Sequence, residues 1–466
     1  MTKYDVIIVG AGVGGLICGN FLAKYGKKVL IIEQHDRPGG CVTAIKRKDC
    51  VFDMGGHLFG SCNEHGILSE CLSRLNIKVN FARINPSDQF HFNQDVVKVP
   101  SDADEYIELL IGMFPEEALN IKIFFKQIFY LARNFSNNDI IKKFSTLTYQ
   151  DLLNTYFKNN QLKGILSAQY LYIGQKPNKS SALFMAVLMA SYLKDGVYYS
   201  LGGTQVFSDA VYKKFIDYGG ACFFKRRVEK ILINRTSRVA LGVKLRGDDE
   251  ILADVIISNA DARSTIFDLI GVDNFPSQYI NRVAGYQEGP SLFLTFLAIN
   301  DYKKDLSGHR GWHFSSYDMN GNNNPLYISI PTLFDSSIAP TGTHILEILT
   351  ESPYEFTNVK NWDKCKRVMQ DSIFEKVEAL LGPIKEHLLY VDSASPRTME
   401  RYTLNRKGSV YGWAMTPAQT AVNRLQQETP LNNFYFVGHW TTPGCGITSV
   451  AVSGWSLAKK ICDKNN

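Results

Sequence analysis

The 466-residue sequence lacks several signatures, and each absence excludes a class of protein. Its nine cysteines form no C-x-x-C pair and its nine histidines form no H-E-x-x-H pattern, so we expect no metal site. The odd cysteine count also argues against a disulfide framework and indicates a reducing compartment. No apolar run reaches the roughly 18 residues that a membrane-spanning helix needs, and the best candidate, residues 182–193, is too short.

Net charge is low as well. A formal charge of +6 is small for this length, and no dense block of Lys and Arg is present, so we expect no nucleic-acid partner. The mild basic excess suits an acidic ligand such as a pyrophosphate, or loose attraction to an anionic membrane surface. The first expected strand begins at about Tyr4, so we expect no targeting segment before it. These features predict a cytoplasmic protein, with peripheral contact at the inner face of the membrane as an additional hypothesis.

A glycine-rich turn near the start of the chain is the first positive signal. An apolar, β-branched strand over residues 4–9 leads into it, a helix over 16–25 follows, and a strand over 29–32 ends at Glu33. The turn has the G-x-G-x-x-G pattern, written out as Gly10-Ala11-Gly12-Val13-Gly14-Gly15. This arrangement predicts a βαβ unit that binds a nucleotide.

Each part of this unit has a physical task. Gly10 permits the tight turn, Gly12 lets the backbone approach a pyrophosphate, and Gly15 lets the helix pack closely on the strand. The free N–H groups at the helix N-terminus then face the phosphates. Glu33 comes 18 residues after Gly15, where a carboxylate accepts hydrogen bonds from ribose hydroxyls. We include its neighbour Gln34 in the expected site.

Two further glycine pairs follow, in Arg37-Pro38-Gly39-Gly40-Cys41 and in Phe52-Asp53-Met54-Gly55-Gly56-His57. Such pairs allow backbone to lie against a flat ligand. From residue 4 to residue 60 the chain resembles the FAD-binding start of the amine oxidase and phytoene desaturase superfamily. The glycine pairs look most like the branch of carotenoid desaturases, carotene isomerases and retinol saturases. The resemblance implies FAD as cofactor, with Arg37, Gly39 and Gly40 along it and Gly55, Gly56 and His57 near the isoalloxazine.

The same resemblance continues in the middle and at the end of the chain. The family's residue at the position of Val228 contacts adenine through its backbone, and the strand that leads to Asn259 returns to the nucleotide. Near the C-terminus a strand runs into a glycine turn, and a helix is expected over 449–463. Relatives carry an acid where this chain has His439, whose imidazole can still bond a ribityl hydroxyl. The C-terminal contacts that the resemblance implies are Gly438, His439, Gly446 and Ile447.

These matches predict the fold class and a discontinuous cofactor domain. We expect an α/β protein in which a Rossmann-like FAD-binding domain of the glutathione reductase type holds an inserted mixed α+β substrate domain with a helical lobe. The FAD-binding parts are residues 1–75, 196–275 and 396–466, and the substrate parts are 76–195 and 276–395. Residues 102–193 are expected to be mostly helical. Strands are expected within 78–100 and at 222–225, 228–233, 240–245, 251–258, 291–298, 326–330, 344–349 and 388–391.

The reaction follows from the flavin and from the single G-x-G-x-x-G unit. A dedicated NAD(P)H domain would show a second unit, so we expect oxygen, a quinone or another carrier to be the electron partner. The leading hypothesis is an FAD-dependent oxidoreductase that dehydrogenates or saturates a lipophilic molecule such as a carotenoid or polyene, with hydride passing through flavin N5. The candidate catalytic residues are His57, Tyr411 and Trp413, and Trp440 is a further candidate aromatic wall.

Three alternatives remain open at this point. A flavin amine or amino-acid oxidase would need a carboxylate-binding arginine, for which Arg397 and Arg401 are candidates. A non-redox isomerase would use reduced FAD without net electron transfer. An isoprenoid-binding escort protein would share the fold without using the flavin, although the intact glycine motifs argue against it. Covalent flavin attachment through Cys445 is disfavoured, because a small buried side chain explains that cysteine equally well. The sequence predicts neither the substrate nor the oligomeric state.

Overall fold

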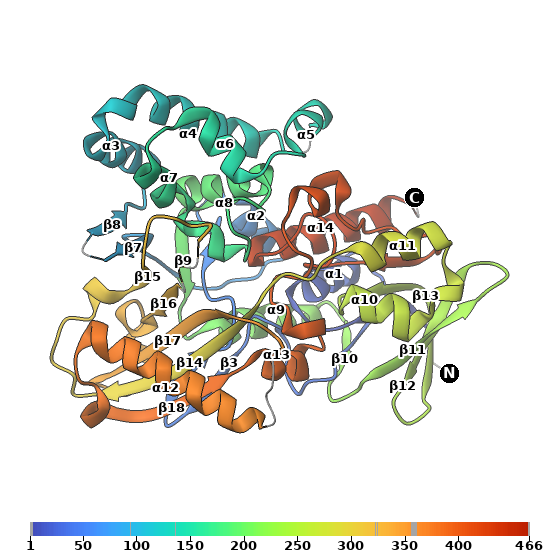
Figure 1. Cartoon of the computed structure of the whole chain (residues 1–466). Coiled ribbons are helices and arrows are strands. Elements are labelled where there is room, and N and C mark those ends of the chain that lie inside the picture. Colours follow the sequence, from blue (N-terminus) through green and yellow to red (C-terminus); the bar gives the residue numbers. More distant parts are fainter. Residues whose placement is uncertain are drawn as a thin grey trace.

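Two large β-sheets organise the computed structural model of the chain (Figure 1), which describes residues 3–93, 95–135, 137–321, 323, 325–355 and 361–464. The first sheet has the strand order β10-β2-β1-β13-β12-β11, and β19 also pairs with β13. Its parallel strands are β10 (Ala221–Phe223), β2 (Val29–Ile32), β1 (Tyr4–Val9), β13 (Glu250–Ser258) and β19 (Phe434–Phe436). Strands β12 (Val239–Leu245) and β11 (Val228–Asn234) extend it in antiparallel fashion.

Helices cover both faces of this first sheet, which explains why β1 and β2 are apolar on both sides. Helices α1 (Val13–Lys24), α9 (Thr204–Asp217) and α14 (Ile447–Asp463) pack on one face. Helices α10 (Ala262–Ser264) and α11 (Ser277–Gly285) belong to the other. The expected strands of this sheet are present with ends shifted by at most two residues, and α1 begins at Val13, three residues before the expected start.

The second sheet is mixed and has the order β18-β14-β17-β16-β15-β7-β8. These strands are β18 (Leu388–Ala394), β14 (Ser291–Asn300), β17 (Thr343–Ser352), β16 (Leu326–Ser329), β15 (Gly311–Phe314), β7 (Asp88–Phe92) and β8 (Asp95–Val99). Helix α12 (Trp362–Leu381) covers one face. Alternate residues of β14 divide between the two faces: Phe293 and Leu297 pack toward α12, whereas Leu294 and Phe296 face the opposite way.

Two short sheets and two helices lie between the larger parts of the chain. One pairs β3 (Ala44–Arg47) with β4 (Cys50–Asp53), and the other has the order β5 (Phe59–Gly60), β9 (Val197–Ser200), β6 (Phe81–Arg83). Helix α2 (Ile67–Arg74) follows β5 along the chain, and helix α13 (Pro396–Thr403) follows β18. Strand β15 and helix α12 were not expected from the sequence.

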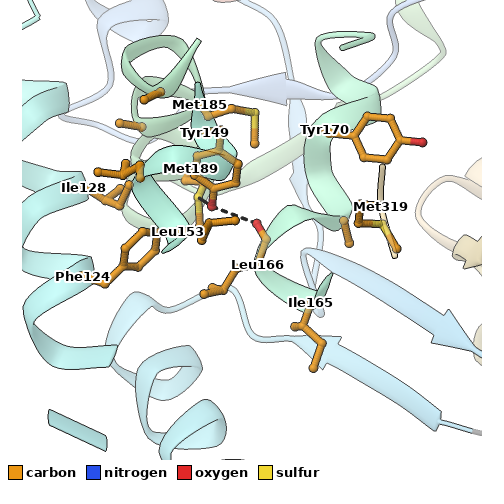
Figure 2. Close-up of a cluster of buried hydrophobic side chains, with 14 of the residues drawn as sticks. Phe124, Ile128, Tyr149, Leu153, Ile165, Leu166, Tyr170, Met185, Met189 and Met319 are labelled. Atoms are coloured by element: carbon orange, nitrogen blue, oxygen red, sulfur yellow. Dashed lines mark hydrogen bonds between the residues drawn. The ribbon is translucent and has the colours of Figure 1, made fainter. Parts of the chain in front are cut away.

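Helices α3 to α8 form the expected helical lobe, at the top of Figure 1. They are α3 (Ala103–Met113), α4 (Ala118–Arg133), α5 (Asn138–Phe144), α6 (Tyr149–Tyr156), α7 (Asn160–Ser167) and α8 (Ala182–Asp195). Figure 2 shows the core of the lobe, where the Tyr149 hydroxyl donates to Leu166 O at 3.0 Å. Met319 reaches this core from the loop between β15 and β16, so the lobe and the mixed sheet are packed together.

The α/β fold class is thereby confirmed, with a Rossmann-like sheet, a mixed sheet and a helical lobe in the expected places along the chain. The exact division into domains stays a prediction. Within the described ranges, no helix is both long and apolar enough to cross a membrane.

Candidate cofactor and substrate site

One large cavity of about 1150 Å³ joins the edge of the first sheet to the inner face of the mixed sheet. Its wall contains the glycine turn after β1, the end of β2, the segment that follows β4, and the turn before α14. Of the residues predicted to hold FAD, all except Ala11 and Gly15 line this cavity. Those that do are Gly10, Gly12, Val13, Gly14, Glu33, Gln34, Arg37, Gly39, Gly40, Gly55, Gly56, His57, Val228, Asn259, Gly438, His439, Gly446 and Ile447.

The N-terminus of α1 forms the narrowest part of this wall. Gly12 is the N-cap residue, and no side chain caps the helix. A Cβ atom on Gly14 would lie 2.9 Å from the Cα of Gly438, and one on Gly15 would lie 2.5 Å from Gly10 O. Side chains are thus excluded on both sides of a helix end whose N–H groups are free, which is the arrangement that binds a phosphate group. Gly15 serves the packing of α1 behind the cavity wall.

Glu33 ends β2 and fixes the backbone around this turn. Its Oε2 accepts from the Ala11 N–H at 2.7 Å, and its Oε1 accepts from the His35 N–H at 2.8 Å. Ala11 therefore contributes to the site indirectly, through the carboxylate that lines the cavity. The sequence prediction gave Glu33 only a ribose-binding task, and the structure adds a task in holding the glycine turn.

The turn before α14 presents a second uncapped helix N-terminus, with Gly446 as the N-cap residue. A buried arginine, Arg424, braces this turn by donating to Thr441 O at 2.8 Å and to His439 O. Burial lowers the pKa of Arg424 to about 10. Burial and the neighbouring Arg424 lower the pKa of His439 to about 3, so its imidazole is neutral at physiological pH.

Cys445 and Cys41 line the cavity as thiols rather than thiolates. Burial raises the pKa of each to about 11. A thiol is a poor nucleophile, which agrees with the expectation that the flavin is not attached through Cys445.

His57 lies where the cofactor half of the cavity meets the mixed sheet. Its Nδ1 is 3.1 Å from the carbonyl oxygen of Gly55, so Nδ1 carries a proton and Nε2 is an acceptor. The Nε2 atom is buried and has no partner among the described residues. Burial is the main cause that lowers the pKa of His57. The ring is stacked on Tyr327 with centroids 6.0 Å apart.

Glu347, from β17, stands behind His57. Its Oε2 is 3.7 Å from His57 Nδ1, and its Oε1 accepts from the Asp53 N–H at 2.6 Å. Glu347 is only 1% exposed. Burial, and then the negative charge of Asp53, raise its pKa well above the ordinary value. The pKa shifts at Glu347 and His57 both favour the uncharged form of each residue. In that form the carboxyl group of Glu347 carries a proton that it can release.

Asp53 is buried and fully engaged by its neighbours. Its Oδ1 accepts from the backbone N–H and the hydroxyl of Thr204 at 2.8 and 2.7 Å, and its Oδ2 accepts from the Tyr199 hydroxyl at 2.8 Å. These bonds tie β4 to β9 and to the first residue of α9. Asp53 and Glu347 together thus position the loop that carries His57.

Aromatic side chains wall the inner half of the cavity, beyond His57. Trp312 and Tyr327 have ring centroids 4.6 Å apart, and Tyr172 lies 5.7 Å from Trp312. Tyr192 and the predicted Tyr411 also line this part, and the Tyr411 hydroxyl donates to Leu171 O at 2.6 Å. Aliphatic residues complete the wall: Leu58, Leu292, Leu294 and Leu349.

Three sequence expectations fail at this cavity. Trp413 is fully buried outside the cavity wall, where it packs edge-on against Trp440 at 4.8 Å and under the Arg263 guanidinium. Trp440 is buried there too, so neither tryptophan is a wall for substrate. Arg397 and Arg401 lie over the rings of Trp362 and Tyr402, and neither lines the cavity. Trp413 and Trp440 were misplaced because large aromatic side chains are also used to fill the hydrophobic core, as both do here.

Several residues at this site were not predicted from sequence. Glu347, Tyr172, Tyr192, Trp312 and Tyr327 come from parts of the chain with no recognisable motif. The only available signal was a glutamate at the centre of the otherwise apolar strand expected at 344–349, since a buried carboxylate in a strand needs a partner.

Comparisons with known proteins agree with this geometry. A model of the NAD(P)-binding Rossmann-like domain matches residues 8–75. Over 98% of its length the chain is 24% identical to prolycopene isomerase 1 of an Oncidium hybrid cultivar, of which 84% is covered. It is 23% identical to a 4,4'-diapophytoene desaturase of Staphylococcus aureus strain COL, with 96% of each chain covered. Putrescine oxidase has the same fold, with a TM-score of 0.68 at 16% identity over 99% of both chains.

Proposed function

Because the chain belongs to the superfamily of FAD-dependent amine oxidases and phytoene desaturases, we propose that it is an FAD-dependent oxidoreductase acting on a lipophilic small molecule. The reaction dehydrogenates or saturates a carotenoid, a polyene or a similar chain. The observation that carries this proposal is the continuity of the cavity, which runs from the uncapped end of α1 past His57 into its inner half. We call this inner half, walled by Tyr172, Tyr192, Trp312, Tyr327 and Tyr411, the chamber. One cavity can thus hold a dinucleotide and an apolar substrate against each other.

The residues present fit FAD. The α1 N-terminus and the glycines that exclude side chains there would hold the diphosphate, and Glu33 would bond the ribose of the adenosine half. Gly55, Gly56 and the turn before α14 would lie along the flavin half. When bound, FAD supplies a centre that accepts or donates a hydride. Oxygen, a quinone or another carrier would exchange electrons with it.

His57 and Glu347 move the proton that accompanies the hydride. His57 lines the cavity, its buried Nε2 is an acceptor with no partner among the described residues, and Glu347 stands at Nδ1. In a dehydrogenation the substrate proton passes to Nε2 of His57, and Glu347 gives up its own proton to solvent, so that the carboxylate balances the imidazolium. In a saturation the same pair returns the proton. His57 is the catalytic residue in this proposal, and Glu347 is a positioning residue.

The wall of the chamber supports a lipophilic substrate. Tyr172, Tyr192, Trp312 and Tyr327 offer flat faces, which suit a conjugated chain, and aliphatic side chains fill the gaps between them. Neither Arg397 nor Arg401, the candidate carboxylate-binding residues of an amino-acid oxidase, lines the cavity. The named relatives act on polyenes, whereas the amine oxidase likeness concerns the fold.

An isomerase that uses reduced FAD is a second candidate, and one observation favours it. The uncharged His57–Glu347 pair holds a proton at the chamber, and reversible protonation of a polyene lets its double bonds rotate. Such a reaction consumes no electron acceptor, which separates it from the oxidoreductase by stoichiometry.

The test uses the purified full-length protein. We expect a flavin absorption spectrum, and bleaching of that spectrum when polyenes are added anaerobically to the oxidised protein or recovery when they are added to the reduced one. A polyene that isomerises on the reduced protein with no spectral change identifies the isomerase. A protein that neither contains nor takes up FAD, or one bleached by amines alone, refutes the proposal.

A second proposal concerns where the protein acts, namely in peripheral contact with a membrane. Helix α4 exposes Leu119 and Ile123 to solvent, by 71% and 44%, and Tyr130 further along the same helix. Lys122 and Lys126 alternate with them in the sequence. Exposed apolar residues beside lysines are typical of helices that lie in the headgroup region of anionic membranes. We propose that α4 contacts the membrane from which a lipophilic substrate enters.

A further inference from the structure

The inner end of the chamber contains polar groups that a hydrocarbon substrate would not use. Asp88, at the start of β7, is 2% exposed, and its Oδ2 accepts from the Tyr172 hydroxyl at 2.5 Å. Asp88 does not line the cavity, but Tyr172 does. A carboxylate therefore stands behind a cavity-lining tyrosine and fixes which way its hydroxyl proton points.

The direction of this hydrogen bond leaves the Tyr172 oxygen as an acceptor only. Burial raises the pKa of Asp88 to about 6, so the carboxylate is mostly ionised at neutral pH and accepts the tyrosine proton. Burial and Asp88 raise the pKa of Tyr172 well above its ordinary value, so the phenol keeps that proton. With the proton committed to Asp88, the Tyr172 oxygen can only accept, either from the neighbouring Tyr327 hydroxyl or from a group in the cavity.

Trp312 supplies a donor at the same place. It is 5% exposed, it lines the cavity beside Tyr172, and its Nε1–H has no acceptor among the described residues. An unpaired buried donor is unfavourable, and a ligand atom that accepts from it removes that cost. The chamber thus offers one donor and one acceptor on neighbouring side chains.

We propose that this end of the chamber binds a hydroxyl group on the substrate, with Tyr172 and Trp312 as its contacts and Asp88 as a positioning residue. This inference rests on the proposed function and narrows its substrate class to polyene or isoprenoid alcohols. A hydroxyl donates to the Tyr172 oxygen and accepts from the Trp312 Nε1–H, so it satisfies both groups. A carbonyl oxygen only accepts, and an ammonium group only donates.

The charges around Asp88 argue against a cationic substrate. The Arg310 guanidinium is 3% exposed and acts on Asp88 to lower its pKa, against the effect of burial. Since that positive charge already offsets the carboxylate, the site has no uncompensated negative charge for an ammonium group.

The experiment compares ligands that differ only at one end. The FAD-loaded full-length protein is titrated with a conjugated polyene alcohol, with the same polyene ending in a methyl group, and with the matching aldehyde and amine. Binding is read from the shift of the polyene absorption band. We expect the alcohol to bind about tenfold more tightly than the methyl compound, because one to two hydrogen bonds are worth about that factor.

Variants assign the preference to the named groups. Tyr172→Phe and, separately, Trp312→Phe should each remove most of the preference for the alcohol over the methyl compound, and the ratio of the two affinities measured on the same variant is the readout. Asp88→Asn should reduce the preference by freeing the Tyr172 proton. Tyr170→Phe is the matched control: Tyr170 is two residues away and buried in the lobe core (Figure 2), and it does not line the cavity. It should keep the full preference.

The outcomes separate this inference from the proposed function. Equal affinity for the alcohol and the methyl compound, tighter binding of the amine, or a preference that survives both Tyr172→Phe and Trp312→Phe overturns the hydroxyl site. In each of those cases the protein still binds FAD and a polyene. Failure to bind FAD or any of the polyenes refutes the proposed function instead. If one variant does not fold, the other still decides.

Discussion

The His57–Glu347 pair gives the sharpest test of the proton chemistry, through the substitution Glu347→Gln. Glutamine keeps the size of the side chain, and its amide oxygen can still accept from the Asp53 N–H as Glu347 Oε1 does at 2.6 Å. What the variant loses is the ability to become negative at 3.7 Å from His57 Nδ1. We expect the loop that holds His57 to keep its place, and the proton transfer to slow.

The size of the effect follows from the distance. Two unit charges about 4 Å apart attract by about 4 kcal/mol at an effective dielectric constant of about 20. Each ~1.4 kcal/mol corresponds to a factor of ten in rate, so losing the whole attraction would slow the step by about a thousandfold. The glutamine dipole recovers part of this stabilisation. We therefore expect the flavin half-reaction to slow by about a hundredfold to a thousandfold.

The assay is the anaerobic rate of flavin bleaching, or of reoxidation, with a saturating polyene across a range of pH. Because a lone imidazolium is less stable, the limb of the pH profile that reports His57 should move to lower pH in Glu347→Gln. Glu117→Gln is the control, since Glu117 is also a buried carboxylate but accepts from the Lys158 and Asn159 N–H groups in the helical lobe. A normal rate, or a slow rate with an unmoved pH limb, would refute the proton-pair argument.

Three further predictions concern the cofactor turn, a buried acid and the lobe surface. Gly15→Ala should prevent FAD uptake, because its Cβ would lie 2.5 Å from Gly10 O, whereas Gly112→Ala, with open space around its Cβ, should leave the flavin spectrum unchanged. Burial raises the pKa of Asp88 from 3.8 to about 6, so the folded protein binds this proton more tightly than the unfolded chain does. As the pH rises from about 4 to about 6, ionisation of Asp88 therefore lowers the free energy of unfolding, by about 3 kcal/mol in full. Thermal unfolding should accordingly show Asp88→Asn gaining stability relative to the natural protein over that interval. The double substitution Leu119→Glu and Ile123→Glu should lower cosedimentation with anionic vesicles several-fold.

Each of these predictions has an outcome that contradicts it. Normal flavin content in Gly15→Ala would show that α1 tolerates a shift from β1. A stability difference for Asp88→Asn that does not change with pH would mean that the carboxyl stays in one protonation state over that interval. For the vesicle assay, Val422→Glu is the control, because Val422 is 55% exposed outside the lobe. Equal losses in the control and the double variant would remove α4 as the contact.

The sequence predicted the first sheet well because its signals are local. Strands β1 and β2 are apolar runs next to glycines, and the turn between them has a fixed spacing. Helix α12 was missed because only one narrow face is apolar, with Ile373, Val377 and Leu381 buried in a helix that otherwise consists mostly of polar and charged residues. Strand β15 was missed because four residues beside a glycine carry too little periodicity.

The residues of the site also fall into a group that could be predicted from the sequence and a group that could not. The residues that would hold FAD could be named because close backbone approach demands glycine at fixed positions, and such positions are visible in one sequence. Trp413 was wrong because an aromatic residue near a glycine motif can equally well fill the core, as it does against Trp440. Glu347 and Tyr172 act through partners about 290 and 84 residues away, and no pattern in the chain links them.

The register of the mixed sheet sets the geometry of the whole chamber. Trp312, Tyr327 and Glu347 come from β15, β16 and β17, three neighbouring strands, and all three point to the side that faces His57. Glu347 pairs with Phe296 of β14 on one side and with Ser329 of β16 on the other. A slip of one residue in β17 would turn Glu347 toward α12 and bring Leu346 or Ile348, which now pack on that helix, to His57. The pairing of these strands, and not any motif, therefore decides whether His57 has a partner for its proton.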